Sequence, residues 1–179
     1  LVEQLDAVRP RLEFRGQAGK PSNECALEVH KHCVMPRDFN TAFHLAVPPN
    51  LQPKQIKKFG FHQLVMDGLV ERELLKQEAA RLGISISEEQ VDEELYHGRF
   101  HYSLPAERYA VATMYTYVPV TNPKTEKFDY DIYKRAVKNY TRMSGKDFKQ
   151  YQTEELVAAR MRELVKLPVE ISDAEAFAQ

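Results

Sequence analysis

The longest regular pattern in the chain is an apolar stripe between Pro53 and Leu82. Its members recur every three or four positions, at Phe61, Leu64, Val65, Gly68, Leu69, Leu75, Ala79 and Leu82. Charged residues fall mostly between them, as on the outer face of an amphipathic helix. The spacing predicts one helix over 53–82, with a kink at Gly60 and a close helix crossing at Gly68. Gly83 follows as a residue that accepts the left-handed conformation at a helix end.

Capping boxes mark the starts of further helices. In such a box a serine and the side chain three residues later each satisfy a backbone N–H that lacks a helical partner. Boxes at Ser87, Ser144 and Ser172 predict helices over 88–96, over 145–166 and from 173 onward. Asp129 is an expected N-cap for a helix over 130–142, and Pro36 is expected to open an earlier one.

The expected fold is therefore mainly α, with five or six helices and a small N-terminal β-hairpin. The helix over 53–82 is expected to be the spine against which the helices 130–142 and 145–166 pack. Residues 1–25 are predicted to be an N-terminal segment or linker, with a short strand at 12–14. Residues 26–179 are predicted to form the helical domain.

The hairpin is expected to turn at His30 and Lys31, which sets Glu28 opposite Cys33 and leaves Cys25 outside the ladder. A disulfide would require Cys25 to fold back until the two Cα atoms lie within about 7 Å. We therefore favour a loop cysteine and a small buried Cys33, with the disulfide as the alternative. A metal site using His30, His32 and Cys33 is a weaker alternative, because neighbours on a strand point to opposite faces.

The segment from His97 to Lys127 has the least regular pattern of the chain. It is rich in aromatic residues and prolines, and 106–116 is predicted to be a helix followed by a loop. Because its tyrosines follow no helical face, they are candidates for contact with another molecule.

Several classes of function are excluded by what the sequence lacks. The formal net charge of −1 removes the basic excess that nucleic-acid binding needs. No glycine-rich phosphate loop and no metalloprotease or hydrolase motif occurs, so we expect no catalytic residues, no cofactor and no metal. The glutamate pairs at 88–89 and 93–94 fit the solvated face of a short helix. No apolar run reaches the roughly 18 residues of a membrane-spanning helix.

Four stretches carry a resemblance to a known family. Residues 79–91 read A-A-R-L-G-I-S-I-S-E-E-Q-V, at the end of the apolar stripe. Residues 128–133 read F-D-Y-D-I-Y, and two further stretches follow at 144–148 and 160–165. In order, they resemble the N-terminal chaperone region of SurA/PpiD/PrsA-type extracytoplasmic peptidyl-prolyl isomerases. The resemblance covers about residues 26–175, and the family's Asn-Gly hairpin turn is replaced here by His30-Lys31.

The resemblance implies a module that holds unfolded client polypeptides of the bacterial cell envelope, including those bound for the outer membrane. In this family a parvulin isomerase domain follows the region that resembles 169–173. The chain contains none of the parvulin signatures, so the resemblance implies a non-catalytic piece of a parent that is a peptidyl-prolyl isomerase (rotamase). The expected location is periplasmic or otherwise extracytoplasmic. The resemblance allows a parent with or without a membrane anchor.

A client site needs exposed, adaptable apolar side chains. The candidates are Phe100, Met114, Tyr115, Tyr117 and Met66, with core filling as the competing interpretation of the methionines. The expected function is ATP-independent holding of unfolded exported polypeptides. The alternative is a structural or dimerisation module that forms a homodimer and binds no client.

Overall fold

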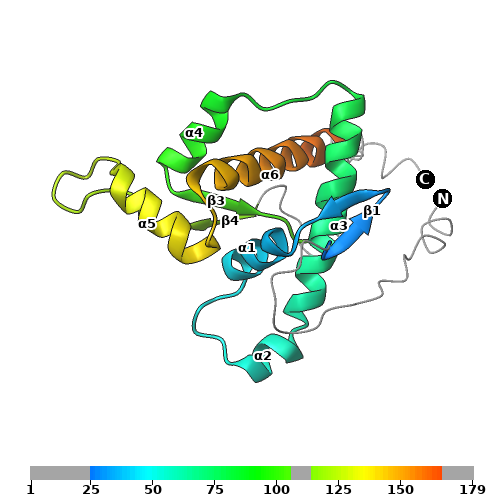
Figure 1. The fold of residues 1–179 in the computed structure, drawn as a ribbon, viewed down its shortest axis with the longest axis horizontal. Helices are drawn as coiled ribbons and strands as arrows, with labels where there is room; N and C mark the ends of the chain where they lie inside the picture. Colours follow the sequence, from blue (N-terminus) through cyan, green and yellow to red (C-terminus); the bar gives the residue numbers. More distant parts are fainter. Residues whose placement is uncertain (1–24, 106–113, 167–179) are drawn as a thin grey trace, which may run out of the picture.

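A computed structural model describes residues 25–105 and 114–166 (Figure 1). It is mainly α-helical, with a hairpin at the start and a second two-stranded sheet in the middle of the chain. The expected strand at 12–14 and the expected helix from 173 lie outside the described residues. Within the described residues, none of the helices combines the length and apolar character needed to cross a membrane.

The N-terminal hairpin has the predicted register. Strands β1 (Leu27–Val29) and β2 (His32–Val34) pair antiparallel, with Glu28 opposite Cys33. The two turn residues, His30 and Lys31, both have positive φ, at 49° and 68°. Such angles fit a tight hairpin turn, because its twist matches that of the strands.

The preference for unbonded cysteines was wrong, because Cys25 and Cys33 form a disulfide with Cα atoms 5.3 Å apart. Cys25 precedes β1 and is not held by the ladder, so the chain can fold back there without breaking strand pairing. The bond also removes Cys33 as a metal ligand. Among the described residues, no cluster of histidine, cysteine and acidic side chains is placed to hold a metal ion.

The single helix expected over 53–82 is two helices, α2 (Pro53–Lys58) and α3 (Phe61–Arg81). They are separated at Gly60, whose φ of 68° lies in the left-handed region that interrupts helical hydrogen bonding. The predicted kink is therefore a break. Gly83 does adopt the expected left-handed geometry after α3, with a φ of 71°.

The remaining helices begin at their predicted caps. They are α1 (Pro36–Ala46), α4 (Glu88–Tyr96), α5 (Tyr130–Thr141) and α6 (Gly145–Lys166). Ser87 and Gln90 form the reciprocal capping box of α4, and the Asp129 carboxylate accepts from two N–H groups at the start of α5. Ser144 accepts from the backbone N–H of Asp147.

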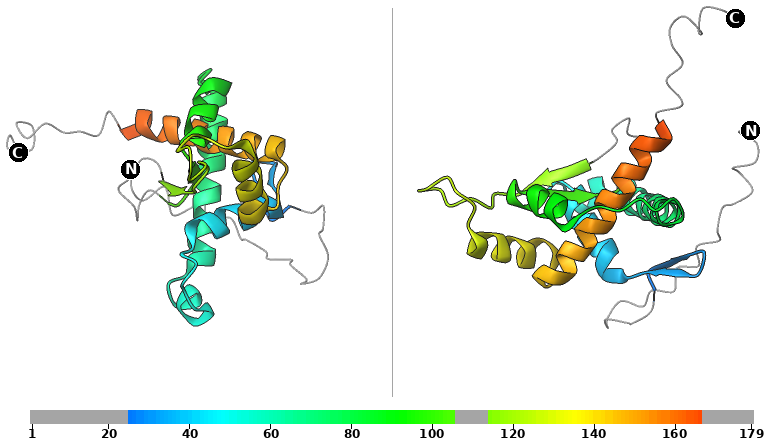
Figure 2. Two further views of the ribbon diagram at one scale, coloured as in Figure 1. Left: turned by 90° about the vertical axis from the view of Figure 1, so that its left-hand side faces the viewer. Right: turned by 90° about the horizontal axis from the view of Figure 1, so that it is seen from above.

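Helix α3 is the spine of the molecule, and α6 crosses it in the largest helix–helix contact of the described part (Figures 1 and 2). The expectation that α5 also packs on α3 was wrong. Helix α5 packs on α1 and α6, on the side of these two helices away from α3 (Figure 1). Its apolar stripe therefore faces a second core rather than the spine.

The prediction of a helix over 106–116 was wrong for residues 114–116, which the structure describes. Residues Met114–Tyr117 form strand β4, paired antiparallel with β3 (Arg99–Tyr102), whereas 106–113 lie outside the described residues. Alternation of half-buried and exposed residues along β4 fits a strand, and threonine and tyrosine both favour one.

The helices and sheets enclose two hydrophobic cores. One lies between α4, α5, α6 and the β3–β4 sheet, centred on the fully buried Phe100 and Phe148. The other joins the hairpin, α1 and α3 around Val65 and Leu69. Gly68 marks a close approach as predicted, but to the backbone of Ser103 after β3 rather than to another helix.

Candidate client-binding site

An apolar groove lies between α4, α5 and the first turns of α6. Its volume is about 550 Å³. It is lined by Asp92, Leu95, Tyr96, Phe128, Tyr130, Tyr133, Gly145, Lys146 and Lys149. We call it the aromatic groove, because four of these residues carry aromatic rings.

The rings of the aromatic groove support one another. Tyr96, at the end of α4, stacks on Phe128 with ring centroids 5.1 Å apart. Phe128 in turn lies 5.8 Å from Tyr133, and Tyr130 lies 6.1 Å from Tyr133. Tyr133 is buried and meets Phe100 edge-on, which anchors the row in the core. Tyr96 and Tyr130 remain 49% and 64% exposed, so the row ends in two rings open to solvent.

One of the two lysines at the rim of the groove is paired with acidic side chains. Lys149 lies 2.9 Å from Asp92 and 3.0 Å from Glu88, and these hydrogen bonds, led by that to Asp92, raise the pKa of its ammonium. Burial raises the pKa of Tyr133 to about 12, so its hydroxyl stays neutral at physiological pH. The groove therefore offers apolar rings and hydroxyls with little net charge, which suits varied partners.

The five residues predicted from sequence lie in different places. Phe100 is fully buried beneath the aromatic groove, and Met66 is buried in the core between α1 and α3. Neither can contact a client in this conformation. Met114 is half-buried against the same core as Met66. Only Tyr115 and Tyr117 present large exposed surfaces, and they lie on β4 rather than in the aromatic groove.

Sequence reasoning missed Tyr96, Phe128 and Tyr130 as client-contacting candidates. A signal existed for Tyr130, which precedes Tyr133 by three positions and extends the apolar stripe of α5 beyond its core. Tyr96 and Phe128 are far apart in sequence, so only the fold could bring them into a stack.

A buried ionic cluster joins α1, α3 and α6. Arg72 of α3, 1% exposed, lies 3.0 Å from Glu155 of α6 and 3.6 Å from Asp38 of α1. Its guanidinium also lies over the ring of Tyr151, 5.1 Å from the centroid. Burial raises the pKa of Asp38, with Arg72 opposing the shift. Burial disfavours the charge of Arg72, yet Glu155 and the other acids raise its pKa above the ordinary value.

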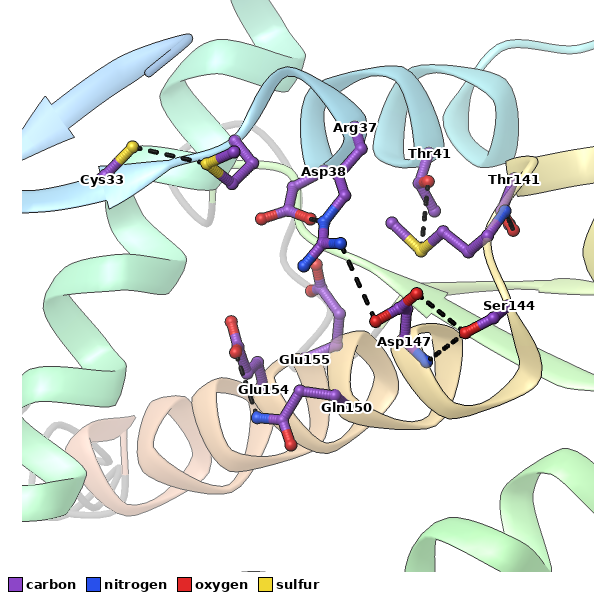
Figure 3. A network of polar contacts seen from close by, with 12 residues as sticks. Cys33, Arg37, Asp38, Thr41, Thr141, Ser144, Asp147, Gln150, Glu154 and Glu155 are labelled. Carbon is purple, nitrogen blue, oxygen red and sulfur yellow. Dashed lines mark hydrogen bonds and ion pairs between the residues drawn. The ribbon is translucent and has the colours of Figure 1, made fainter. Parts of the chain in front are cut away.

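The surroundings of this cluster fit a structural junction. Figure 3 shows Asp38 of α1 and Glu154 and Glu155 of α6 on facing sides of two helices, with Arg37 reaching Asp147 nearby. Ser103, after β3, donates a hydrogen bond to Glu155, so the junction also fixes the end of that strand. The cluster lies outside the aromatic groove, and its charges are engaged in pairs that hold helices together.

The mainly helical fold with an N-terminal hairpin agrees with the class of chaperone-type domain that the sequence resembles. The family described as SurA-like N-terminal domain matches residues 13–103, and the chain belongs to it. The matched part includes the hairpin, α1 to α4 and β3. Domains of this family are non-catalytic chaperone modules of extracytoplasmic proteins. No curated protein and no solved structure matches the chain.

Proposed function

We propose that the chain is an ATP-independent holding module that binds unfolded or partly folded exported polypeptides in the aromatic groove. The observation that carries this proposal is the row of rings running from the buried Tyr133 to the exposed Tyr130 and Tyr96. A volume of about 550 Å³ lies within the range of sites that take small ligands, and it is open enough to admit a few client side chains.

The physical basis of holding is reversible burial of apolar surface. Covering an exposed aromatic ring with a client side chain removes apolar area from water at about 25 cal/mol per Å². Two exposed rings therefore provide modest affinity, which allows release without an energy source. Because tyrosine loses little conformational entropy on binding, it suits partners of varied sequence.

The parent protein and its location form a second part of the proposal. We infer that the parent is a parvulin-type peptidyl-prolyl isomerase of the periplasm or another extracytoplasmic compartment. Membership of the SurA-like family supports this inference. The disulfide between Cys25 and Cys33 independently supports the extracytoplasmic location, since such bonds persist mainly in oxidising compartments.

Holding is tested by the aggregation of a chemically denatured protein diluted into buffer with and without the chain. The wild-type chain should slow the rise in light scattering, and Tyr96→Ala combined with Tyr130→Ala should remove most of that effect. Phe59→Ala is the matched control, because Phe59 is an equally exposed aromatic residue directly after α2 and outside the groove. Equal protection by the groove variant and wild type would disprove the assignment of the groove.

The structural or dimerisation alternative makes a different prediction in solution. A tight dimer that leaves aggregation unchanged would favour that alternative over client holding. A monomer that slows aggregation would favour the chaperone. Mass measurement by sedimentation on the same preparation decides between them.

A further inference from the structure

The register of β4 with β3 determines which main-chain groups of β4 point away from β3. The N–H of Val118 donates to the carbonyl of Gly98, and the ladder continues from there with Phe100 opposite Thr116. In an antiparallel pair, residues that exchange hydrogen bonds alternate with residues that do not. The main-chain groups of Thr116 and Met114 therefore point toward β3. Those of Tyr115 and Tyr117 point away from it.

The opposite edge of this sheet is occupied at His101. His101 of β3 directs its own main-chain groups outward, where its N–H donates to Oε1 of Gln152 at 2.8 Å. Nε2 of Gln152 donates back to the His101 carbonyl at 3.0 Å. Gln152 belongs to α6 and is fully buried, so one side-chain amide takes the place of a neighbouring strand. At His101 the place of a further strand on this edge is therefore already taken.

The β4 edge is open within the described part of the chain. No hydrogen bond there reaches the main-chain groups of Tyr115 or Tyr117, and these residues are 50% and 63% exposed. Folded proteins usually protect such edges with proline, lysine or an inward charge. The four residues of β4, Met114 to Tyr117, include none of these.

We propose that β4 binds an extended segment of an unfolded polypeptide as a third strand, through the main-chain N–H and C=O groups of Tyr115 and Tyr117. Strand addition rests on the proposed function and deepens it, because it names the chemical feature of the client that is recognised. Every extended chain carries the same backbone groups, so the contact is tolerant of sequence. The exposed rings of Tyr115 and Tyr117 add apolar contact beside the new strand.

A second copy of the chain fits this edge less well than a client does. A stable protein–protein interface buries about 1,200 Å² or more in total, and pairing of two four-residue strands supplies only a small part of that area. A weak, reversible contact with an extended chain needs no such area.

The first test compares three fluorescent peptides of the same alternating valine–threonine sequence, titrated into the wild-type chain by anisotropy. One is unmodified, one is N-methylated at every second residue, and one is N-methylated at successive residues. N-methylation at every second residue blocks one edge of an extended peptide and leaves the other free. Because β4 offers a single edge, this peptide should bind within about threefold of the unmodified one. The peptide methylated at successive residues should bind at least about tenfold more weakly.

The second test changes the protein. Tyr117→Pro removes the outward N–H together with the side chain, and Tyr117→Ala removes the side chain alone. Proline is tolerated on an edge strand where its N–H would face solvent. The proline variant should bind the unmodified peptide several-fold more weakly than the alanine variant. Circular dichroism establishes that both variants are folded, and the peptide series on wild-type protein decides the matter if the proline variant does not fold.

The outcomes separate this inference from the proposed function. Equal binding of all three peptides, or no peptide binding at all, would overturn strand addition. If aggregation is still slowed in that case and still depends on Tyr96 and Tyr130, holding by the aromatic groove stands. A wild-type dimer that becomes monomeric on Tyr117→Pro would assign the edge to a second copy and would also overturn the inference.

Discussion

Glu94, near the end of α4, ties that helix to strand β3 through two basic side chains. Its carboxylate accepts hydrogen bonds from Arg99 at 2.6 and 2.8 Å, and its Oε2 lies 2.6 Å from Nε2 of His101. The hydrogen bonds from Arg99, opposed by partial burial and assisted by His101, lower the pKa of Glu94 from 4.5 to about 2. Burial lowers the pKa of His101.

The pH dependence of stability follows from the sign of the Glu94 shift. A carboxyl group whose pKa is lower in the folded state stabilises that state above its unfolded pKa, and the contribution is lost as the pH falls toward the folded pKa. Stability should therefore fall between about pH 4.5 and about pH 2. Glu94→Gln should be less stable at neutral pH and should lose less on acidification through this range. Urea unfolding followed by circular dichroism measures the free energy of unfolding of both proteins at each pH. If the two free energies fell in parallel as the pH is lowered, the prediction would be contradicted.

At the same scale, sequence alone could not separate buried aromatic residues from exposed ones. Phe100 and Tyr117 belong to the same irregular, aromatic segment, yet one is fully buried and the other 63% exposed. Phe100 is covered by the rings of Tyr133 from α5 and Phe148 from α6, whereas Tyr117 has no such cover among the described residues. That covering is set by long-range packing, which leaves no local pattern in four-residue strands.

At the level of elements, Gly68 sets the distance between α3 and the segment after β3. A Cβ added there would lie 2.3 Å from the carbonyl oxygen of Ser103 and 2.7 Å from its carbonyl carbon. These are backbone atoms that cannot rotate away. The same segment is held by the hydrogen bond from Ser103 to Glu155, so both sides of the contact resist displacement.

Gly68→Ala should therefore destabilise the fold by about 1–3 kcal/mol, the usual cost of overpacking a filled site. Gly145→Ala is the matched control, since a Cβ at this first position of α6 would meet nothing within 4 Å. The control should be neutral or slightly stabilising, because alanine favours helix more than glycine does. The comparison uses urea unfolding free energies, and equal values for the two variants would refute the close-contact argument.

The boundaries of the elements were predictable wherever a local hydrogen bond defines them. The caps at Ser87 and Asp129 and the turn at His30 act within a few residues, so sequence locates them. The break at Gly60 and the strand at Met114–Tyr117 depend on competition between local preference and packing. Because helical spacing continues across Gly60, the sequence predicts a kink there rather than a separation of α2 from α3.

For the whole molecule, the expected lack of isomerase activity is directly testable. The wild-type chain should not accelerate cis–trans isomerisation of a proline-containing peptide at concentrations that slow aggregation of a denatured protein. The physical reason is that the described residues offer a groove of aromatic side chains and a structural ionic cluster, and the sequence contains no parvulin signature. A protease-coupled isomerisation assay measures the rate. Clear catalysis would overturn the non-catalytic assignment.

The family match covers only the first part of the molecule. The family match ends at residue 103, whereas α5, α6 and β4 follow it. The aromatic groove combines Leu95 and Tyr96 from the matched part with Phe128, Tyr130 and Tyr133 from beyond it. The proposed site therefore exists only when both parts are packed together.

The sequence by itself determined the helical class, the hairpin register and the caps, because periodicity, turn residues and capping side chains act over a few residues. It also carried the family resemblance, through the motif at 79–91 within the matched segment and those at 128–133, 144–148 and 160–165 beyond it. Only the tertiary structure decided that Cys25 reaches Cys33, that Tyr96 stacks on Phe128, and that Gln152 occupies the β3 edge at His101. Each of these contacts depends on where the chain returns in space, and local preferences do not determine that return.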